Sequence, residues 1–416
     1  MTPEIKQQIE QIRRGEVPEG FKHNSASVMP CDWNTCDFHE VATIQSGLVS
    51  PKEEPYCFMF HIGPDNIERD TGRIGNLKTA CELGLVSGKF YFDAGSIVYS
   101  KIRPNLNKVC IPNFEGICSA DCYSIKARAG IDRDYLFNLM LSFPFYRRAV
   151  ACSMRTGMPK INQDDLNAIP VVMPSQLEEQ QKIAAILTTQ DKVIELKERL
   201  LAEKQRQKKY LMQQLLTGKK RLPGFSGEWK EERLGKLFLE RKETNCEGLQ
   251  MLAITGTQGI IPRKELDLKD NSSEDKSKYL RVCVGDIGYN TMRMWQGVSA
   301  YSNYEGIVSP AYTILKPCPS INAKYYAYLF KMPEIIFLFY RFSQGLVDDT
   351  RNLKYENFKK IKVFYPPDIE EQAAIAEVLS VADREIDLLQ QNIKQEKQKK
   401  KALMQLLLTG IVRVCG

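Results

Sequence analysis

The residue types that perform catalysis or bind cofactors lack the usual spacing in this sequence. No two glycines stand two positions apart, so there is no Gly-x-Gly phosphate or dinucleotide loop, and no Walker-type lysine follows a glycine-rich run. The one Pro-Pro pair lies between Tyr365 and Asp368, so it lacks the Asp/Asn-Pro-Pro-aromatic pattern of adenine methyltransferases. The sequence therefore predicts a chain with no catalytic residues and no cofactor site.

Metal-binding chemistry is also poorly supported by the sequence. The chain has 12 cysteines and 3 histidines, and none of the cysteines forms a Cys-x-x-Cys pair. Structural zinc sites usually combine such pairs with further cysteines or histidines. Cys118 and Cys122 are the closest pair, and we expect both to be small, buried and reduced. No metal site is predicted.

Composition indicates an ordinary globular protein with more than one domain. The chain has 416 residues, of which 43% are hydrophobic and 26% charged, and its net charge is +7. No apolar run approaches the length needed to span a bilayer, and the N-terminus is polar. We expect no membrane association and a cytoplasmic location. The mildly basic balance permits an anionic partner.

An internal duplication dominates the organisation of the chain. The stretch 178–218 returns as 370–410, and 18 of the 41 aligned positions are identical without a gap. Each copy begins with Glu-Glu-Gln, after a proline, and ends with Leu-Leu-Thr-Gly. The repeat predicts two similar half-molecules, each a globular segment followed by a long helix.

Both repeats carry the 3- and 4-residue apolar spacing of a coiled-coil seam. At roughly 40 residues, each helix would be about 60 Å long and would need a partner along its length, which we expect to be the other copy. Polar seam positions at Lys204, Lys208, Glu396 and Lys400 are expected to fix the register through cross-helix charge pairs. The apolar seam positions are Ile183, Leu187, Ile194, Leu201, Leu211 and Leu215 in one copy, and Ile375, Leu379, Ala382, Ile386, Leu389, Ile393, Leu403 and Leu407 in the other.

The globular segments repeat more loosely and read as mixed α/β domains. Short strands are expected at 97–99 and 313–315, where β-branched and aromatic residues lie between glycine turns. Helices are expected at 135–141 and 323–330. Because the helices match closely while the globular segments have diverged, we expect a constant helical spacer that carries two domains with different binding targets.

The sequence resembles the specificity subunits of type I restriction–modification systems over its whole length. The resemblance rests on the run 211–225 with Trp229 after it, on the Pro-then-Glu-Glu-Gln helix starts, and on the run 285–297. Residues 11–15 and 18–21 are similar to the helix end at 214–218 and 223–225. This similarity fits the circular arrangement of that family, in which the N- and C-terminal pieces lie near each other and complete the pseudo-symmetry.

The resemblance implies a fold and a set of segments. The fold would be mixed α+β, with two mixed α/β target-recognition domains joined by two long antiparallel coiled-coil helices in a pseudo-twofold internal repeat. The segments would be an N-terminal helical fragment (1–27), the first recognition domain (28–174), the first spacer helix (175–222), the second recognition domain (223–367) and the second spacer helix (368–416).

The resemblance also implies function and partners. Similar proteins bind a bipartite double-stranded DNA site, one domain on each half-site, while the helices set the gap. They recruit two methylation subunits that use S-adenosylmethionine, and restriction subunits that use ATP and Mg²⁺ to translocate and cleave DNA. The chain itself would be a non-catalytic scaffold.

Candidate DNA-contacting residues are side chains able to read base edges or bind phosphates. They are predicted at Lys101, Arg103, Asn105, Lys108, Lys160 and Asn162 in the first domain, and at Asn290, Arg293, Trp295, Gln296, Arg351, Asn352 and Lys354 in the second.

Two alternatives stay open at this point. The chain could be a coiled-coil adaptor whose divergent domains bind proteins, or the recognition part of a related restriction–methylation enzyme of another type. An adaptor would show no salt-dependent affinity for DNA.

Overall fold

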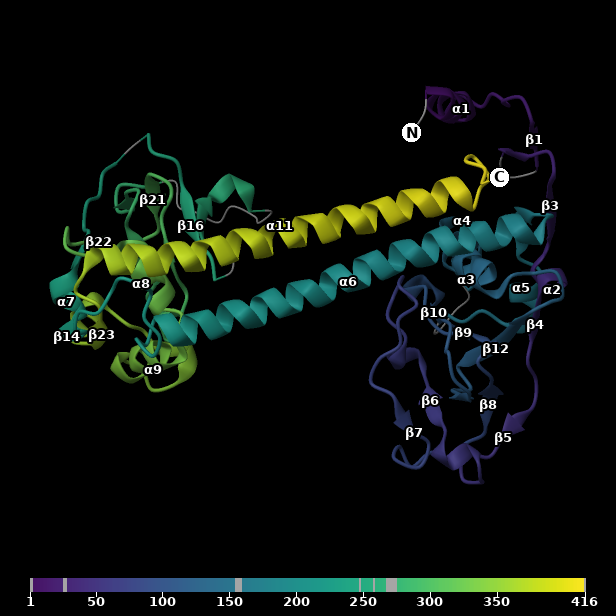
Figure 1. The fold of residues 1–416 in the computed structure, drawn as a ribbon, viewed down its shortest axis with the longest axis horizontal. Helices are drawn as coiled ribbons and strands as arrows, with labels where there is room; N and C mark the ends of the chain where they lie inside the picture. The colour runs from purple at the N-terminus through teal and green to yellow at the C-terminus, as the bar shows by residue number, and fades with distance from the viewer. Residues whose placement is uncertain are drawn as a thin grey trace. The chain divides into compact units, whose positions relative to one another are not determined.

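The computed structural model describes residues 3–24, 28–153, 159–246, 248–256, 259–266 and 275–414. The chain forms two compact units: unit 1 comprises residues 1–197 and 392–416, and unit 2 comprises residues 198–391. Two long helices, α6 (Leu177–Leu215) and α11 (Ile369–Leu407), contribute residues to both units (Figure 1). Each unit therefore contains one mixed α/β domain, the first part of one long helix and the last part of the other.

Local sequence sets the ends of both helices. Each has 39 residues, close to the predicted length, and each begins shortly after a proline, Pro174 or Pro367. The negative charges of Glu-Glu in the first turn of each helix interact favourably with the positive end of the helix dipole. Gly218 and Gly410 follow the helix ends with φ of 70° and 71°, the left-handed conformation that terminates helices.

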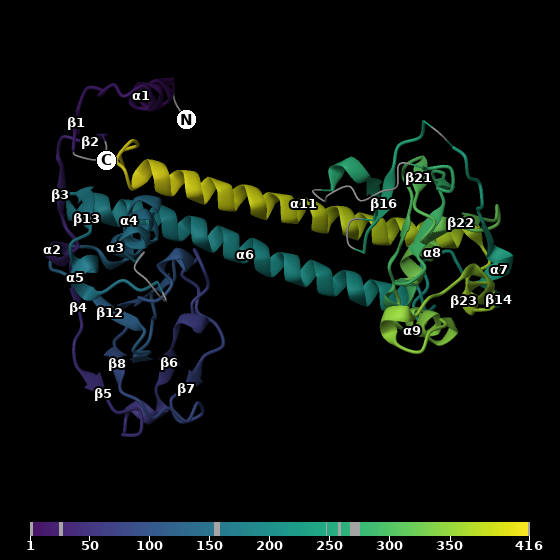
Figure 2. The same cartoon turned by 180° about the vertical axis from the view of Figure 1, so that it is seen from behind.

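In unit 1 the first part of α6 lies beside the last part of α11 (Figures 1 and 2). Lys400 Nζ lies 2.7 Å from Asp191 Oδ1, and Lys197 Nζ lies 2.6 Å from Glu396 Oε1. The partners fall in number along α11 as they rise along α6, so the pairing is antiparallel. Gln190, a buried residue of α6, donates a hydrogen bond of 2.8 Å to Glu396 Oε2.

Unit 2 repeats the antiparallel pairing with the other helix ends. Lys204 Nζ lies 2.8 Å from Glu385 Oε2, and Lys208 forms an ion pair with Asp383. The predicted cross-helix charge pairs are confirmed at all four polar seam positions. Lys208–Asp383 and Lys400–Asp191 occupy equivalent positions in the two repeats, as the predicted pseudo-symmetry requires. The apolar seam is buried at Ile183, Leu187, Ile194 and Leu215, and at Ile375, Leu379, Ile386, Ile393 and Leu407.

The domain of unit 1 is built on two main sheets. A four-stranded sheet has the order β10-β9-β12-β4, and a five-stranded sheet has the order β5-β8-β11-β6-β7. Their strands are β4 (Ala42–Ile44), β5 (Leu48–Val49), β6 (Phe60–Ile62), β7 (Lys78–Thr79), β8 (Lys89–Phe92), β9 (Ile97–Ser100), β10 (Val109–Cys110), β11 (Gly116–Cys118) and β12 (Cys122–Ala127).

Two further antiparallel strand pairs and several helices complete unit 1. Strand β1 (Phe21–His23) pairs with β2 (Val28–Pro30), and β3 (Trp33–Asp37) pairs with β13 (Pro170–Pro174), both antiparallel. The helices are α1 (Pro3–Arg13), α2 (Phe38–Val41), α3 (Arg133–Leu141), α4 (Phe143–Ser153) and α5 (Gln163–Asn167), with the 3₁₀ turns η1 (Tyr56–Phe58), η2 (Pro64–Asn66) and η3 (Pro104–Leu106).

Two hydrophobic clusters hold unit 1 together. The larger joins the four-stranded sheet and α3 to the start of α6 and the end of α11, and it includes Trp33, Tyr135, Leu187 and Leu407. The smaller contains Cys118 and Cys122, both fully buried and both free thiols, as predicted. Burial raises the pKa of Cys118 to about 12, so this thiol is protonated and unreactive at neutral pH.

The domain of unit 2 has a four-stranded sheet with the order β15-β22-β19-β20 and smaller two-stranded pairs. Its strands are β14 (Lys230–Arg233), β15 (Phe238–Glu240), β16 (Leu252–Ile254), β17 (Ile260–Pro262), β18 (Leu280–Val282), β19 (Ile287–Asn290), β20 (Ser299–Tyr301), β21 (Gly306–Val308), β22 (Tyr312–Pro317) and β23 (Lys362–Tyr365). Its helices are α7 (Leu234–Leu237), α8 (Ala323–Leu329), α9 (Pro333–Phe342) and α10 (Tyr355–Phe358), with 3₁₀ turns η4 (Arg263–Glu265), η5 (Met294–Gln296) and η6 (Asp348–Thr350).

The two domains share their central strand pairs. Tyr99 of β9 is opposite Tyr123 of β12, and Tyr289 of β19 is opposite Thr313 of β22. The strands predicted at 97–99 and 313–315 and the helices predicted at 135–141 and 323–330 are confirmed as β9, β22, α3 and α8. The predicted fold class, two mixed α/β domains with two long paired helices, is confirmed.

Candidate functional site

The Glu-Glu-Gln motif at the start of each long helix fixes the domain to that helix. In unit 1, Gln180 accepts a hydrogen bond of 2.9 Å from the backbone N–H of Asp132, the N-cap residue of α3, and donates to the Pro174 carbonyl. In unit 2, Gln372 accepts one of 2.8 Å from the N–H of Asn322, the N-cap residue of α8. Both glutamines are buried, so each domain is held to its helix by a desolvated amide.

The middle residue of the motif, a glutamate, binds an arginine that follows a helix end. In unit 2, Arg221 donates two hydrogen bonds of 2.5 and 2.7 Å to Glu371 and lies over the Trp229 ring. In unit 1, Arg413 donates to Glu179 at 2.7 and 3.0 Å and lies over the Trp33 ring.

Arg413 therefore does in unit 1 what Arg221 does in unit 2, although it belongs to the C-terminal tail of the chain. It also donates two hydrogen bonds to Asp32, at 2.8 and 2.6 Å. These charged hydrogen bonds lower the pKa of Asp32. The tail thus completes the first domain.

The candidate residues of the first domain meet at a strand–loop joint. The backbone N–H of Ile161 donates a hydrogen bond of 2.9 Å to the carbonyl of Lys101, and that of Arg103 donates one of 2.7 Å to Pro159. These bonds bring the residues after β9 against those before α5, some 60 positions later in the chain, with Ile102 bridged to Lys160. Lys101, Arg103 and Lys160 are thus brought together.

The charges at this joint are suited to an anion. Lys101 is half-buried, and its Nζ lies 5.2 Å from the centroid of the Tyr123 ring. Burial and then the charge of Lys160 lower the pKa of Lys101. A phosphate bound between the two ammonium groups would relieve their repulsion.

The other candidates of the first domain lie nearby in different roles. Arg103 and Asn105 are exposed around η3, and Arg103 has a left-handed φ of 48°. Lys108 donates a hydrogen bond of 2.6 Å to the Pro64 carbonyl, and Asn162 caps α5 by accepting from Asp165. Those two side chains have structural partners, so their DNA contacts stay predictions.

The second domain has the same joint. The backbone N–H of Leu353 donates a hydrogen bond of 2.8 Å to the carbonyl of Thr291, which directly follows β19 as Lys101 directly follows β9. This bond joins the segment after β19, which carries Arg293, Trp295 and Gln296, to the segment that carries Arg351 and Asn352.

Aromatic rings and an arginine stack beside this second joint. The guanidinium of Arg351 lies 4.0 Å from the centroid of the Tyr340 ring, and its Nη2 donates to Tyr340 Oη at 3.2 Å. The ring of Trp295 meets the same tyrosine edge-on, with centroids 6.2 Å apart. Trp295 Nε1 donates to the Met292 carbonyl, so the indole is held in place.

The remaining candidates of the second domain surround this stack. Arg293, Gln296 and Lys354 are exposed. Asn290 accepts a hydrogen bond from the N–H of Met292, and the Oδ1 atom of Asn352 is buried without a partner. The structure thus groups the predicted residues of each domain, and their contacts with DNA stay predictions.

Tyr340 and Lys331 belong to this site but are absent from the sequence prediction. Lys331 donates to the carbonyls of Gly297 and Ser299, at 2.7 and 2.5 Å, and so holds the segment that follows η5. Burial lowers the pKa of Lys331 to about 8, with a smaller effect from Lys208. An aromatic residue among apolar ones in α9 could have signalled Tyr340, whereas nothing in the sequence pairs Lys331 with residues 297–299.

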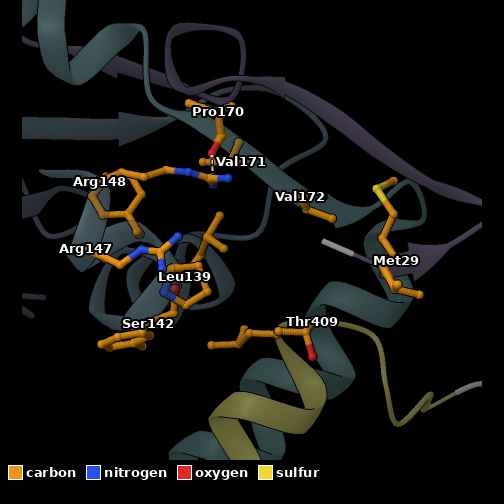
Figure 3. Close-up of a pocket in the computed structure, with 14 residues that line it drawn as sticks. Met29, Leu139, Ser142, Arg147, Arg148, Pro170, Val171, Val172 and Thr409 are labelled. Carbon is orange, nitrogen blue, oxygen red and sulfur yellow. Dashed lines mark hydrogen bonds between the residues drawn. The ribbon is translucent and has the colours of Figure 1, made fainter. Parts of the chain in front are cut away.

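Unit 1 also contains a small pocket that none of the candidate residues lines. Its volume is about 200 Å³, and it lies between α4, β13 and the end of α11 (Figure 3). Arg148 in its wall donates a hydrogen bond of 2.6 Å to the Pro170 carbonyl, and burial lowers the pKa of this arginine. The arginine is thus used to hold β13.

Within the described ranges, no three His, Cys, Asp or Glu side chains are grouped so that they could hold a metal ion. No helix in that part of the chain is long and apolar enough to cross a membrane.

A family model described as the type I restriction modification DNA specificity domain matches residues 30–205 and 267–397, more than half of the chain. The chain is 41% identical over 181 residues to the type I restriction enzyme EcoDI specificity subunit of Escherichia coli, covering 44% of this chain and 38% of that subunit. It is 25% identical over 442 residues to the putative type I restriction enzyme MjaX specificity subunit of Methanocaldococcus jannaschii, covering 95% and 97% of the two chains.

Two solved structures have the same fold. The type I restriction–modification S subunit from M. genitalium aligns with a TM-score of 0.57 and 14% identity, covering 93% of this chain and 97% of that one. The HsdS subunit from Thermoanaerobacter tengcongensis aligns with a TM-score of 0.51 and 21% identity, covering 93% and 99%.

Proposed function

Because the chain belongs to the type I restriction–modification DNA specificity family, we propose that it recognises a bipartite DNA sequence, one half-site for each domain. Unit 1 reads one half-site with the residues around Lys101 and Lys160. Unit 2 reads the other with the residues around Trp295 and Arg351. Cationic side chains bind phosphates and fix the position, while amide and guanidinium groups read base edges.

One observation carries this proposal: the same joint presents different side chains in the two domains. Lys101 of unit 1 is replaced by Thr291 in unit 2, and Lys160 is replaced by Asn352, while the backbone hydrogen bond is retained. A conserved backbone with exchanged polar side chains is expected of two domains that bind the same kind of ligand and read different sequences.

The partners follow as part of the same proposal. The chain scaffolds two methylation subunits, which bind S-adenosylmethionine, and restriction subunits, which use ATP and Mg²⁺. Those cofactors belong to the partners, and the chain itself performs no chemistry. Calorimetric titration of the pure chain with S-adenosylmethionine should show no stoichiometric binding, and stoichiometric binding would contradict this division of roles. The cytoplasmic location expected from the sequence stays a prediction.

A salt titration tests DNA binding against the adaptor alternative. The complex of the chain with its methylation subunits should bind its cognate duplex with an affinity that falls linearly with salt on logarithmic axes. A duplex with both half-sites scrambled serves as the control, and it should bind with lower affinity at every salt concentration. Equal affinity for the two duplexes, or affinity independent of salt, would favour an adaptor.

A further inference from the structure

A closed loop, residues 344–352, projects between α9 and α10 in unit 2. Two backbone hydrogen bonds join its ends. The N–H of Gln344 donates to the carbonyl oxygen of Asn352 at 2.8 Å, and the N–H of Asn352 donates to the carbonyl oxygen of Gln344 at 2.7 Å. Gly345 has a φ of 138°, and a Cβ atom there would lie 2.7 Å from the Cα of Arg351. The two chain segments at the neck of the loop, where Gln344 pairs with Asn352, are therefore in close contact. This contact fixes the conformation of the loop.

Arg351 fastens this neck to the domain. Besides its stack on Tyr340, its Nε lies 3.4 Å from Asp348 Oδ1, and only 15% of its side chain is exposed. A guanidinium with these partners is engaged in holding the loop. The residues free to contact a ligand are therefore at the tip of the loop.

The tip of the loop is apolar and fully exposed. Leu346 is 101% exposed and Val347 is 59% exposed. Burial of an aliphatic side chain is favourable, and a loop that holds Leu346 in water gains this stabilisation only when a partner covers it. The next side chain, Asp348, is a carboxylate that is 66% exposed.

We propose that Leu346 contacts the C5-methyl group of a thymine in the major groove of the half-site that unit 2 reads. This inference rests on the proposed function and assigns a residue and a base group within it. Arg351 at the base of the loop and the candidate residue Trp295 contact the same ring, that of Tyr340, so the loop lies beside the candidate site of unit 2. DNA is therefore the ligand that the loop meets.

The chemistry of the tip selects the major groove. Thymine methyl groups and the amino donors of adenine and cytosine are exposed there, which suits an apolar tip followed by a carboxylate acceptor. At A·T pairs the minor groove presents only acceptors, which would repel Asp348. The tip therefore combines an apolar side chain with a hydrogen-bond acceptor, and the major groove presents partners for both.

Uracil substitution tests the contact by removing only the methyl group. The half-site is first identified from the methylated motif of cells that contain the chain and its methylation subunits. Each thymine of that half-site is then replaced singly by uracil, and the affinity of the whole complex is measured. We expect one position at which the wild type loses about threefold to tenfold in affinity. The Leu346→Ala complex should bind the thymine and uracil duplexes equally.

A matched control separates this contact from a general loss of apolar surface. Leu239 of β15 is also in unit 2 and is 55% exposed. The Leu239→Ala complex should retain the full penalty for uracil. Because both leucines are exposed, both variants should melt at the wild-type temperature.

The outcomes distinguish this inference from the proposed function. If the wild-type complex does not distinguish its half-site from a scrambled duplex, the proposed function is wrong. If it does, three results would overturn the thymine contact alone. They are no uracil penalty at any position, a penalty that persists in Leu346→Ala, or a half-site without an A·T pair. Loss of assembly with the methylation subunits in Leu346→Ala would also overturn it, in favour of a protein contact.

Discussion

The backbone N–H of Leu353 donates a hydrogen bond to the carbonyl oxygen of Thr291, and Ile161 makes the same bond to Lys101 in the other unit. In each domain this bond joins the segment that follows a central strand, β9 or β19, to the segment that precedes a short helix, α5 or α10. Side chains from both segments then share one surface. The functional prediction depends on this joint, because it brings candidate side chains from two distant segments of each domain together.

The cations of the first joint should contribute to the salt dependence of DNA binding. Lys160 is exposed beside Lys101, so Lys160→Ala should remove one phosphate contact and reduce the slope of log affinity against log salt by about 0.9. The loss in affinity should be similar for all DNA sequences. Lys52→Ala, at an exposed lysine outside the joint, is the control. A slope that is unchanged in Lys160→Ala would show that this lysine does not bind phosphate.

The C-terminal tail should stabilise unit 1 through Arg413. Arg413→Gln removes charge-assisted hydrogen bonds to Glu179, whose side chain is only 6% exposed, and should cost about 1.5–3 kcal/mol in the free energy of unfolding. Glu179→Gln and the double variant complete a mutant cycle. Calorimetric melting should show that the two single effects are not additive. Additive effects would mean that the ion pair contributes nothing of its own.

Lys331 should give unit 2 a stability that rises with pH. Its pKa is about 8 in the folded chain and about 10.4 in an unfolded one. Between these values the unfolded state binds more protons, so raising the pH favours folding. The stability of the wild type relative to Lys331→Met should rise by about 1 to 2 kcal/mol from pH 7.5 to 9.5.

Comparing the wild type with a variant removes the thiol and tyrosine titrations that both proteins share. Lys360→Met, at an exposed lysine of the same unit, should leave the pH profile unchanged. Calorimetric scans at several pH values measure these differences. A wild-type advantage that falls with pH would contradict the buried charge at Lys331.

The paired helices were predictable from sequence because their seam is a local pattern. The spacing of Ile183, Leu187 and Ile194, and the identities shared by the repeats, are visible without a fold. The strand–loop joints were not predictable, since Lys101 and Ile161 are far apart in the chain. The residue type of Arg351 predicts a DNA contact, whereas its stacking on Tyr340 can be seen only in the structure.

Lengthening both helices should change the gap between the half-sites. Lys197 donates a hydrogen bond of 2.5 Å to Asn392, so the two helices can be extended at opposed positions, after Lys197 and after Gln391. Four residues in each add about one turn, roughly 6 Å, and nearly restore the apolar seam. The cross-helix pairs inside each unit, such as Lys208–Asp383, are kept.

The extra 6 Å corresponds to one to two base pairs, at about 3.4 Å for each pair. The half-site sequences should stay the same while the gap grows by that amount. The methylated motif of cells carrying the extended chain measures both. If a folded, active insertion variant methylates a site with the original gap, the methylation subunits rather than the helices set the spacing.

Replacing one domain tests the central claim most directly. Residues 28–174 are exchanged for the equivalent domain of a related subunit, and the chimera is expressed with its methylation subunits. The Gln180–Asp132 and Arg413–Asp32 contacts are preserved by choosing a donor with matching residues at these positions. Methylome sequencing should show one half of the methylated motif changed and the other half retained. A motif in which both halves change, or in which neither does, would contradict recognition of one half-site by each domain.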